Sequence, residues 1–359
     1  MGHEYVPAPR ASVKPEALDL DGFQAITAPI SREALLAMSR GKLRLYLITG
    51  NDEDTAYVLR VRSLWSALLT TMRGSSVADS QMTAVCNATC VFLQSASSSP
   101  VQSVQKFAMS GETWMAVFDT LLDKFDASKL KPLRQVLNTL MKILKQYEDR
   151  STAHSIQDSV LSKMASIMLL GRPVSRLKAS MVIFEAFIRS GIPLSKILSA
   201  IGRGHGTNID RLHHHSTQRG LENTELRAVV SRYDIDESIC HFSFSILLAV
   251  ADSGVQATAG TLLNNLILTL TGHGISLDSL VVEFVVIVLH QRPQAVEAFK
   301  NYLLPSLFKS YPRHCFDLLF RMVSDTLEPS TLETALTIAI LGCRAGFLSE
   351  EGMSSPTEL

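Results

Sequence analysis

The chain has 359 residues, of which 46% are hydrophobic and 19% are charged, and its formal net charge at pH 7 is zero. This apolar composition excludes disorder for most of the chain, and the length exceeds what one hydrophobic core usually organises. No run of about 18 uncharged apolar residues occurs, and the N-terminus lacks the apolar core of a signal peptide. The sequence therefore predicts a soluble protein of the cytoplasm or nucleus that does not enter a membrane.

The first 30 residues hold four prolines and show no hydrophobic period, which indicates a flexible N-terminal arm over residues 1–30. Helical patterns follow over residues 31–49 and over residues 78–96. Between them, a further helical pattern begins at the polar segment GNDEDT, residues 50–55, and ends near Arg73. The segment SASSSPVQS, residues 95–103, has the composition of a linker.

Beyond this linker, the start signals of helices recur at nearly regular intervals. In the second half of the chain the intervals are 17 to 20 residues, and proline stands at or beside several starts, where its missing N–H costs nothing. The Val-rich residues 281–288 fit this series better as a buried helix than as a strand. Starts are predicted near Glu112, Ser128, Thr152, Pro173, Pro193, Asp236, Gln256, Ser276, Pro293, Pro312 and Ser330.

A helix every 17 to 20 residues implies two-helix units of about 40 residues, the period of HEAT and armadillo repeats. We therefore expect an all-α fold, a right-handed α-solenoid of stacked helical hairpins; a single irregular helical bundle is the alternative. In the solenoid, residues 31–200 are N-terminal repeats with a basic middle, and residues 221–359 are C-terminal repeats that could continue beyond the chain end. The predicted last helix, residues 331–348, is apolar where a terminal repeat should be polar, so we expect a protein partner, a second copy or further repeats to cover it.

The neutral net charge hides an uneven distribution. Residues 129–219 hold 15 basic and 5 acidic residues, whereas residues 220–359 hold 8 basic and 16 acidic ones. Such asymmetry favours an acidic partner for the basic middle, although the two segments could equally balance each other within the fold.

The segment between the two series, IGRGHGTNIDRLHHHSTQRG at residues 201–220, is rich in glycine, histidine and arginine. Its glycine spacing does not match a nucleotide-binding loop, and we predict a long inter-repeat loop. Three consecutive histidines, His213, His214 and His215, seldom converge on one ion, so no metal site is predicted; a metal-dependent enzyme that uses this loop remains an alternative.

Enzyme signatures are missing from the sequence, so no catalytic residue and no cofactor are predicted. The five cysteines are scattered, which favours buried thiols in a reducing compartment. The residues expected to contact nucleic acid or another acidic partner are Lys142, Lys145, Arg172, Arg176, Lys178, Arg203, Arg211 and Arg219.

Residues 299–326, FKNYLLPSLFKSYPRHCFDLLFRMVSDT, together with residues 335–348, ALTIAILGCRAGFL, resemble the thyroid-adenoma-associated family. This family comprises non-catalytic helical-repeat partners of a tRNA ribose 2′-O-methyltransferase. The resemblance covers about 50 residues, and these residues contain no diagnostic motif. It implies a scaffold subunit that binds a protein partner and structured RNA, with tRNA as the candidate. A HEAT-like protein–protein adaptor without a nucleic-acid role is the alternative.

Overall fold

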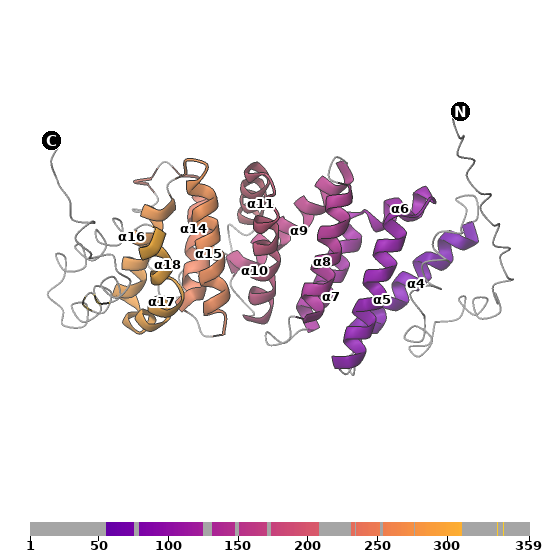
Figure 1. Cartoon of the computed structure of the whole chain (residues 1–359), viewed down its shortest axis with the longest axis horizontal. Coiled ribbons are helices and arrows are strands. Elements are labelled where there is room, and N and C mark those ends of the chain that lie inside the picture. The colour runs from indigo at the N-terminus through magenta and orange to yellow at the C-terminus, as the bar shows by residue number, and fades with distance from the viewer. Residues whose placement is uncertain are drawn as a thin grey trace, which may run out of the picture. The chain divides into compact units, whose positions relative to one another are not determined.

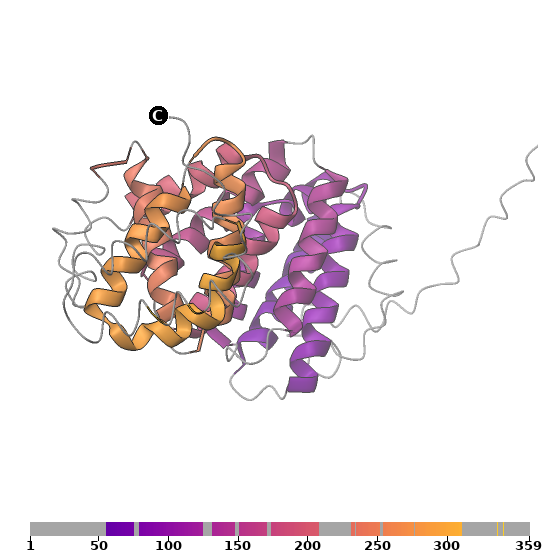
Figure 2. The same cartoon turned by 60° about the vertical axis from the view of Figure 1, so that its left-hand side comes forward.

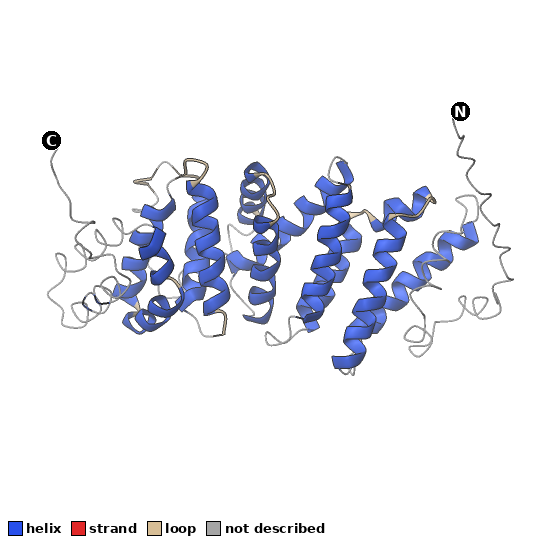
Figure 3. Ribbon diagram, in the orientation of Figure 1, coloured by secondary structure: helices blue, strands red, loops and turns tan. Residues whose placement is uncertain are grey.

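The computed structural model describes most of the chain between residues 55 and 310. The described residues are 55–74, 79–124, 131–147, 151–170, 174–207, 231–233, 235–251, 254–275, 277–310, 336 and 340. Every regular element in these ranges is helical, which confirms the predicted all-α class (Figure 3). The chain divides into two compact units, residues 1–105 (unit 1) and residues 106–359 (unit 2).

The described part of unit 1 contains α4 (Thr55–Arg73) and α5 (Asp79–Ser97), which pack against each other. Trp65 of α4 stacks on Phe92 of α5, with ring centroids 5.5 Å apart. The predicted linker overlaps the end of α5 and the start of the short helix α6 (Gln102–Ala108), and it lies directly before the division between the units.

Unit 2 contains the regular series of helices, and each predicted start from Glu112 to Pro293 lies within three residues of an observed one. The predicted starts at Pro312 and Ser330 lie outside the described residues. The observed elements are α7 (Gly111–Lys124), α8 (Lys131–Gln146), α9 (Ser151–Leu170), α10 (Val174–Arg189), α11 (Leu194–Gly206), α14 (Glu237–Ala251), α15 (Gln256–Thr271), α16 (Leu277–Gln291), a 3-10 turn (Pro293–Ala295), α17 (Val296–Tyr302) and α18 (Leu304–Ser310).

Glycine follows the C-terminal ends of two of these helices. Gly191 follows α10 with φ 76°, and Gly274 follows α15 with φ 83°. Glycine adopts such left-handed angles without a steric penalty, so these positions stop the helix and redirect the chain.

The helices of unit 2 follow one another in chain order, from α7 to α16 (Figures 1 and 2). Helix α9 packs against α7, α10, α11 and α14, and α14 packs in turn against α15 and α16. The aromatic core follows the same path, since Phe184 of α10 meets Phe242 of α14 at 5.2 Å and Phe244 of α14 meets Phe284 of α16 at 5.0 Å between ring centroids. The Val-rich segment around residue 284 is therefore a buried helix, as expected.

The prediction of a loop over residues 201–220 is wrong for residues 201–206, because α11 continues through Gly206. Gly204 lies so close to α9 that a Cβ atom there would stand 2.9 Å from the backbone nitrogen of Ser166. At least one glycine of the GRGHG segment thus serves close helix packing instead of a flexible loop. Residues 208–220 lie outside the described residues.

Three of the five cysteines lie in the described ranges, and Cys86, Cys90 and Cys240 are buried thiols without a disulfide bond, as predicted. Burial raises the pKa of Cys86 to about 12, and neighbouring Cys90 adds to the rise. None of the described helices combines the length and the apolar character that a membrane crossing requires.

Candidate polyanion-binding groove

Helix α8 is strongly amphipathic, and this determines which of its residues reach solvent. Its apolar residues recur at intervals of three and four and are buried. The opposite face is exposed and carries Arg134, Asn138, Lys142 and Lys145, spaced three or four residues apart. Within the described part of the chain, the three cations of this stripe form no ion pair with a carboxylate.

A groove of about 730 Å³ lies beside this stripe, between α8, α10 and α15. Its described lining contains polar, apolar and charged side chains but neither histidine nor cysteine. We call it the α8–α10 groove, and it is lined by Arg134, Leu137, Asn138, Met141, Val182, Glu185, Ala186, Arg189, Ser190, Ala257, Thr258 and Thr261.

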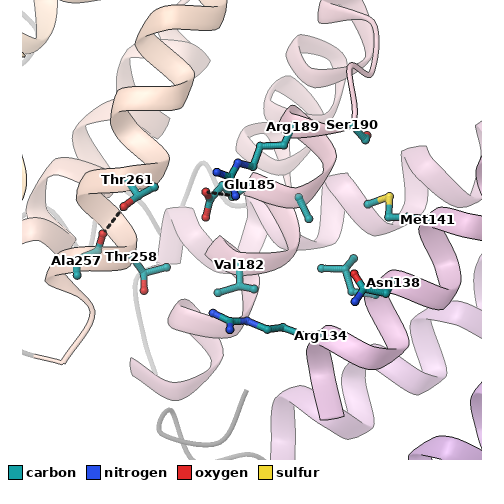
Figure 4. A pocket seen from close by; sticks show the side chains of 12 residues that line it. Arg134, Asn138, Met141, Val182, Glu185, Arg189, Ser190, Ala257, Thr258 and Thr261 are labelled. Carbon is teal, nitrogen blue, oxygen red and sulfur yellow. Dashed lines mark hydrogen bonds and ion pairs between the residues drawn. The ribbon is translucent and has the colours of Figure 1, made fainter. Parts of the chain in front are cut away.

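Two arginines stand on different walls of the α8–α10 groove (Figure 4). Arg134 extends from α8 below Val182, and Arg189 lies on α10 beside Glu185. The Glu185 carboxylate is 3.7 Å from the Arg189 guanidinium and accepts a hydrogen bond from Nδ2 of Asn265 at 3.2 Å. Glu185 therefore offsets part of the charge of Arg189, whereas Arg134 has no described carboxylate partner.

Helical periodicity continues the cationic surface beyond the groove. Lys142 and Lys145 each lie four residues after a lining residue of α8, and Lys178 lies four residues before Val182 on α10. Side chains four residues apart share one helix face, so these three lysines extend the same surface.

Two further predicted contact residues point elsewhere and are already paired. Arg176 of α10 forms an ion pair with Asp123 of α7. Arg203 of α11 lies 3.6 Å from the carboxylate of Asp158 on α9 and donates to the Ser162 hydroxyl at 2.9 Å. The structure therefore does not bring Arg176 and Arg203 to the α8–α10 groove.

The surface over α7, α9 and α11 is electrostatically balanced. Besides the pairs of Arg176 and Arg203, Lys163 lies 3.6 Å from Asp119. Lys196 donates to Oε1 of Gln157 at 2.8 Å and contacts His154; burial lowers the pKa of Lys196, and the charge of Asp158 opposes that shift. Because the acids here neutralise the cations, this surface is a poorer candidate for an anionic ligand than the groove.

Three of the predicted contact residues, Arg172, Arg211 and Arg219, lie outside the described residues, as do the histidines at 213–215. Arg134 and Arg189 line the groove but are not among the eight predicted contact residues. The periodic spacing of polar residues over 131–146 was a signal in the sequence that Arg134 is exposed. The position of Arg189 at the groove follows only from the packing of α15 against α10.

No family model matches the chain, and no curated protein and no solved structure matches it either.

Proposed function

We propose that this protein is a non-catalytic helical-repeat scaffold, of the HEAT/armadillo solenoid type, that binds structured RNA through the α8–α10 groove. The observation that carries the proposal is the exposed stripe of Arg134, Lys142 and Lys145, whose charges no described carboxylate neutralises. RNA fits this stripe because phosphates lie at regular intervals along its backbone and need only accessible cations.

The other wall of the groove supports the same ligand class. Arg189 and the Thr258 side chain line it, and both residue types contact phosphate and sugar oxygens in nucleic-acid complexes. The resemblance of residues 299–326 and 335–348 to a tRNA-modification scaffold makes tRNA the first RNA to test.

A protein partner at the C-terminal end belongs to the proposal as well. Leu336 and Ile340, four residues apart, are 63% and 51% exposed. Two large apolar side chains on one exposed helix face favour cover by a partner protein or by further repeats.

The decisive experiment measures the affinity of the full chain for total tRNA over a series of salt concentrations. We expect the logarithm of the binding constant to fall linearly with the logarithm of the salt concentration, because each phosphate contact releases counterions. The double variant Lys142→Glu/Lys145→Glu should bind more weakly, with a salt slope shallower by about two.

The matched control is Lys300→Glu/Lys309→Glu, which changes the net charge equally at lysines of α17 and α18, outside both the groove lining and the exposed stripe of α8. If both double variants lose affinity to the same extent, net charge explains the binding and the groove is not the site. Absence of tRNA binding at low salt contradicts the RNA proposal and favours a protein–protein adaptor, in which the same cations meet an acidic peptide.

A further inference from the structure

A second cluster of polar side chains lies away from the groove, where the end of α11 meets the beginning of α14. Nε2 of His205 is 2.9 Å from Nδ1 of His241, and the two ring centroids are 5.0 Å apart. Oε1 of Glu237 is 3.8 Å from Nε2 of His241, one helical turn away on α14. One ligand atom from each of these three residues lies within 4.8 Å of the others.

The cluster is partly enclosed, with one open side. His205 is 8% exposed and the His241 side chain 13%, whereas the Glu237 side chain is 61% exposed. The two imidazoles are thus largely removed from water, and the carboxylate stands at the solvent side, where an ion could enter.

We propose that His205, His241 and Glu237 bind a divalent transition-metal ion of the zinc type and join α11 to α14 through it. Two histidines and one glutamate are a donor set that zinc takes in proteins, with a further position left for water. Ligands at Zn–N distances of about 2.0–2.1 Å in a tetrahedron are about 3.3 Å apart, so the imidazoles need only a small separation to admit the ion.

The surroundings favour a cation at this place. Asp236, directly before α14, accepts hydrogen bonds from the Ser238 hydroxyl and from the Ser238 backbone nitrogen, the latter at 2.8 Å. Asp236 directly precedes Glu237 in the chain, so a second carboxylate lies beside the three proposed ligands.

The proposed ion has a structural consequence for unit 2. His205 and His241 are 36 residues apart in sequence, yet α11 and α14 pack against each other. An ion held by both helices would strengthen this junction, because metal binding to the folded state alone adds to its stability. The inference does not depend on RNA binding in the groove.

The test uses the full chain without a histidine tag, and zinc alone as the probe. We expect one zinc per chain by isothermal titration, a higher unfolding temperature with zinc, and tetrahedral d–d absorption when Co²⁺ replaces it. His205→Gln and His241→Gln should each abolish binding of both metals. Glu237→Gln, at an exposed position, should leave the fold intact and weaken zinc binding by at least about tenfold.

Two control variants separate this cluster from other histidines. His273→Gln removes an exposed histidine elsewhere in unit 2, and His213→Ala/His214→Ala/His215→Ala removes the consecutive histidines. Both should retain one zinc per chain. Loss of zinc in the triple variant, retention of zinc in His241→Gln and Glu237→Gln, or no zinc binding by the unchanged chain would each overturn the proposal, which would leave the imidazole pair as a hydrogen bond only.

Discussion

Single residues at the end of α11 show how a polar sequence can serve close packing. In the segment GRGHG, Gly204 meets the backbone of α9, and the next residue, His205, reaches His241 of α14. Both residues are buried, although the segment has the composition of a loop. The absence of a side chain at Gly204 lets α11 approach α9, and the imidazole of His205 contacts α14, so both residues contribute to the packing of these three helices.

Gly204→Ala should lower the free energy of unfolding of unit 2 by about 1–3 kcal/mol, because the new Cβ has no space. It would stand 2.9 Å from the backbone nitrogen of Ser166 and 3.0 Å from Cβ of Ala165. Urea denaturation followed by circular dichroism measures the change.

Gly206→Ala is the matched control, since a Cβ at Gly206 meets nothing within 4 Å. Alanine has the higher helix propensity, so this variant should be neutral or more stable by up to about 1 kcal/mol. Equal destabilisation by both substitutions would show that the close approach of α11 to α9 does not matter for stability.

At the scale of the element, the amphipathic pattern determines which face of a helix is buried. Helix α8 buries its apolar face and exposes its polar face, and this alone places Arg134, Lys142 and Lys145 together. Helix α14 differs, because it is buried over most of its surface and lies between α11, α15 and α16. Contacts with α14 therefore form much of the core of unit 2.

Phe242→Ala should destabilise unit 2 by about 3–5 kcal/mol, the usual cost of removing a buried aromatic ring. Phe242 has no exposed surface, and its ring lies 5.2 Å from that of Phe184. Leu268→Ala on α15 is the control, because Leu268 is 46% exposed and its loss should change stability by no more than about 0.5 kcal/mol. Thermal or urea unfolding of both variants, measured side by side, checks the prediction; similar stability of the two would contradict it.

At the scale of the whole molecule, the chain has two units, and each holds one of its two tryptophans. Trp65 stacks on Phe92 in unit 1, whereas Trp114 in unit 2 is fully buried and donates from Nε1 to the carbonyl oxygen of Ala108 at 3.0 Å. The two indoles are thus separate reporters of the two units.

We expect the units to unfold in separate transitions, because each has its own buried core. Trp65→Phe leaves Trp114 to report on unit 2, and Trp114→Phe leaves Trp65 to report on unit 1. Urea denaturation followed by fluorescence should give different midpoints for the two variants, each matching one phase of the unchanged chain. A single coincident transition for both fluorescence curves and for circular dichroism would show that the units unfold together.

Much of the helical architecture follows from the sequence through local rules. Proline at a first turn, glycine at a left-handed C-terminal position and the three-to-four spacing of apolar residues act within a few residues of each other. For this reason the starts of α9, α10 and α15 were predicted to within one residue. The all-α class and the buried state of the segment around residue 284 were predicted on the same grounds.

Only the tertiary structure decided which side chains from different helices meet. The sequence grouped Arg176 and Arg203 with Lys142, but packing turned both arginines toward acids on neighbouring helices. The pair of His205 and His241 likewise depends on how α11 and α14 cross. Helical periodicity specifies which residues share a face of one helix. Which helix covers that face is set by apolar packing, and no local sequence pattern links residues as far apart as His205 and His241, which are separated by 36 positions.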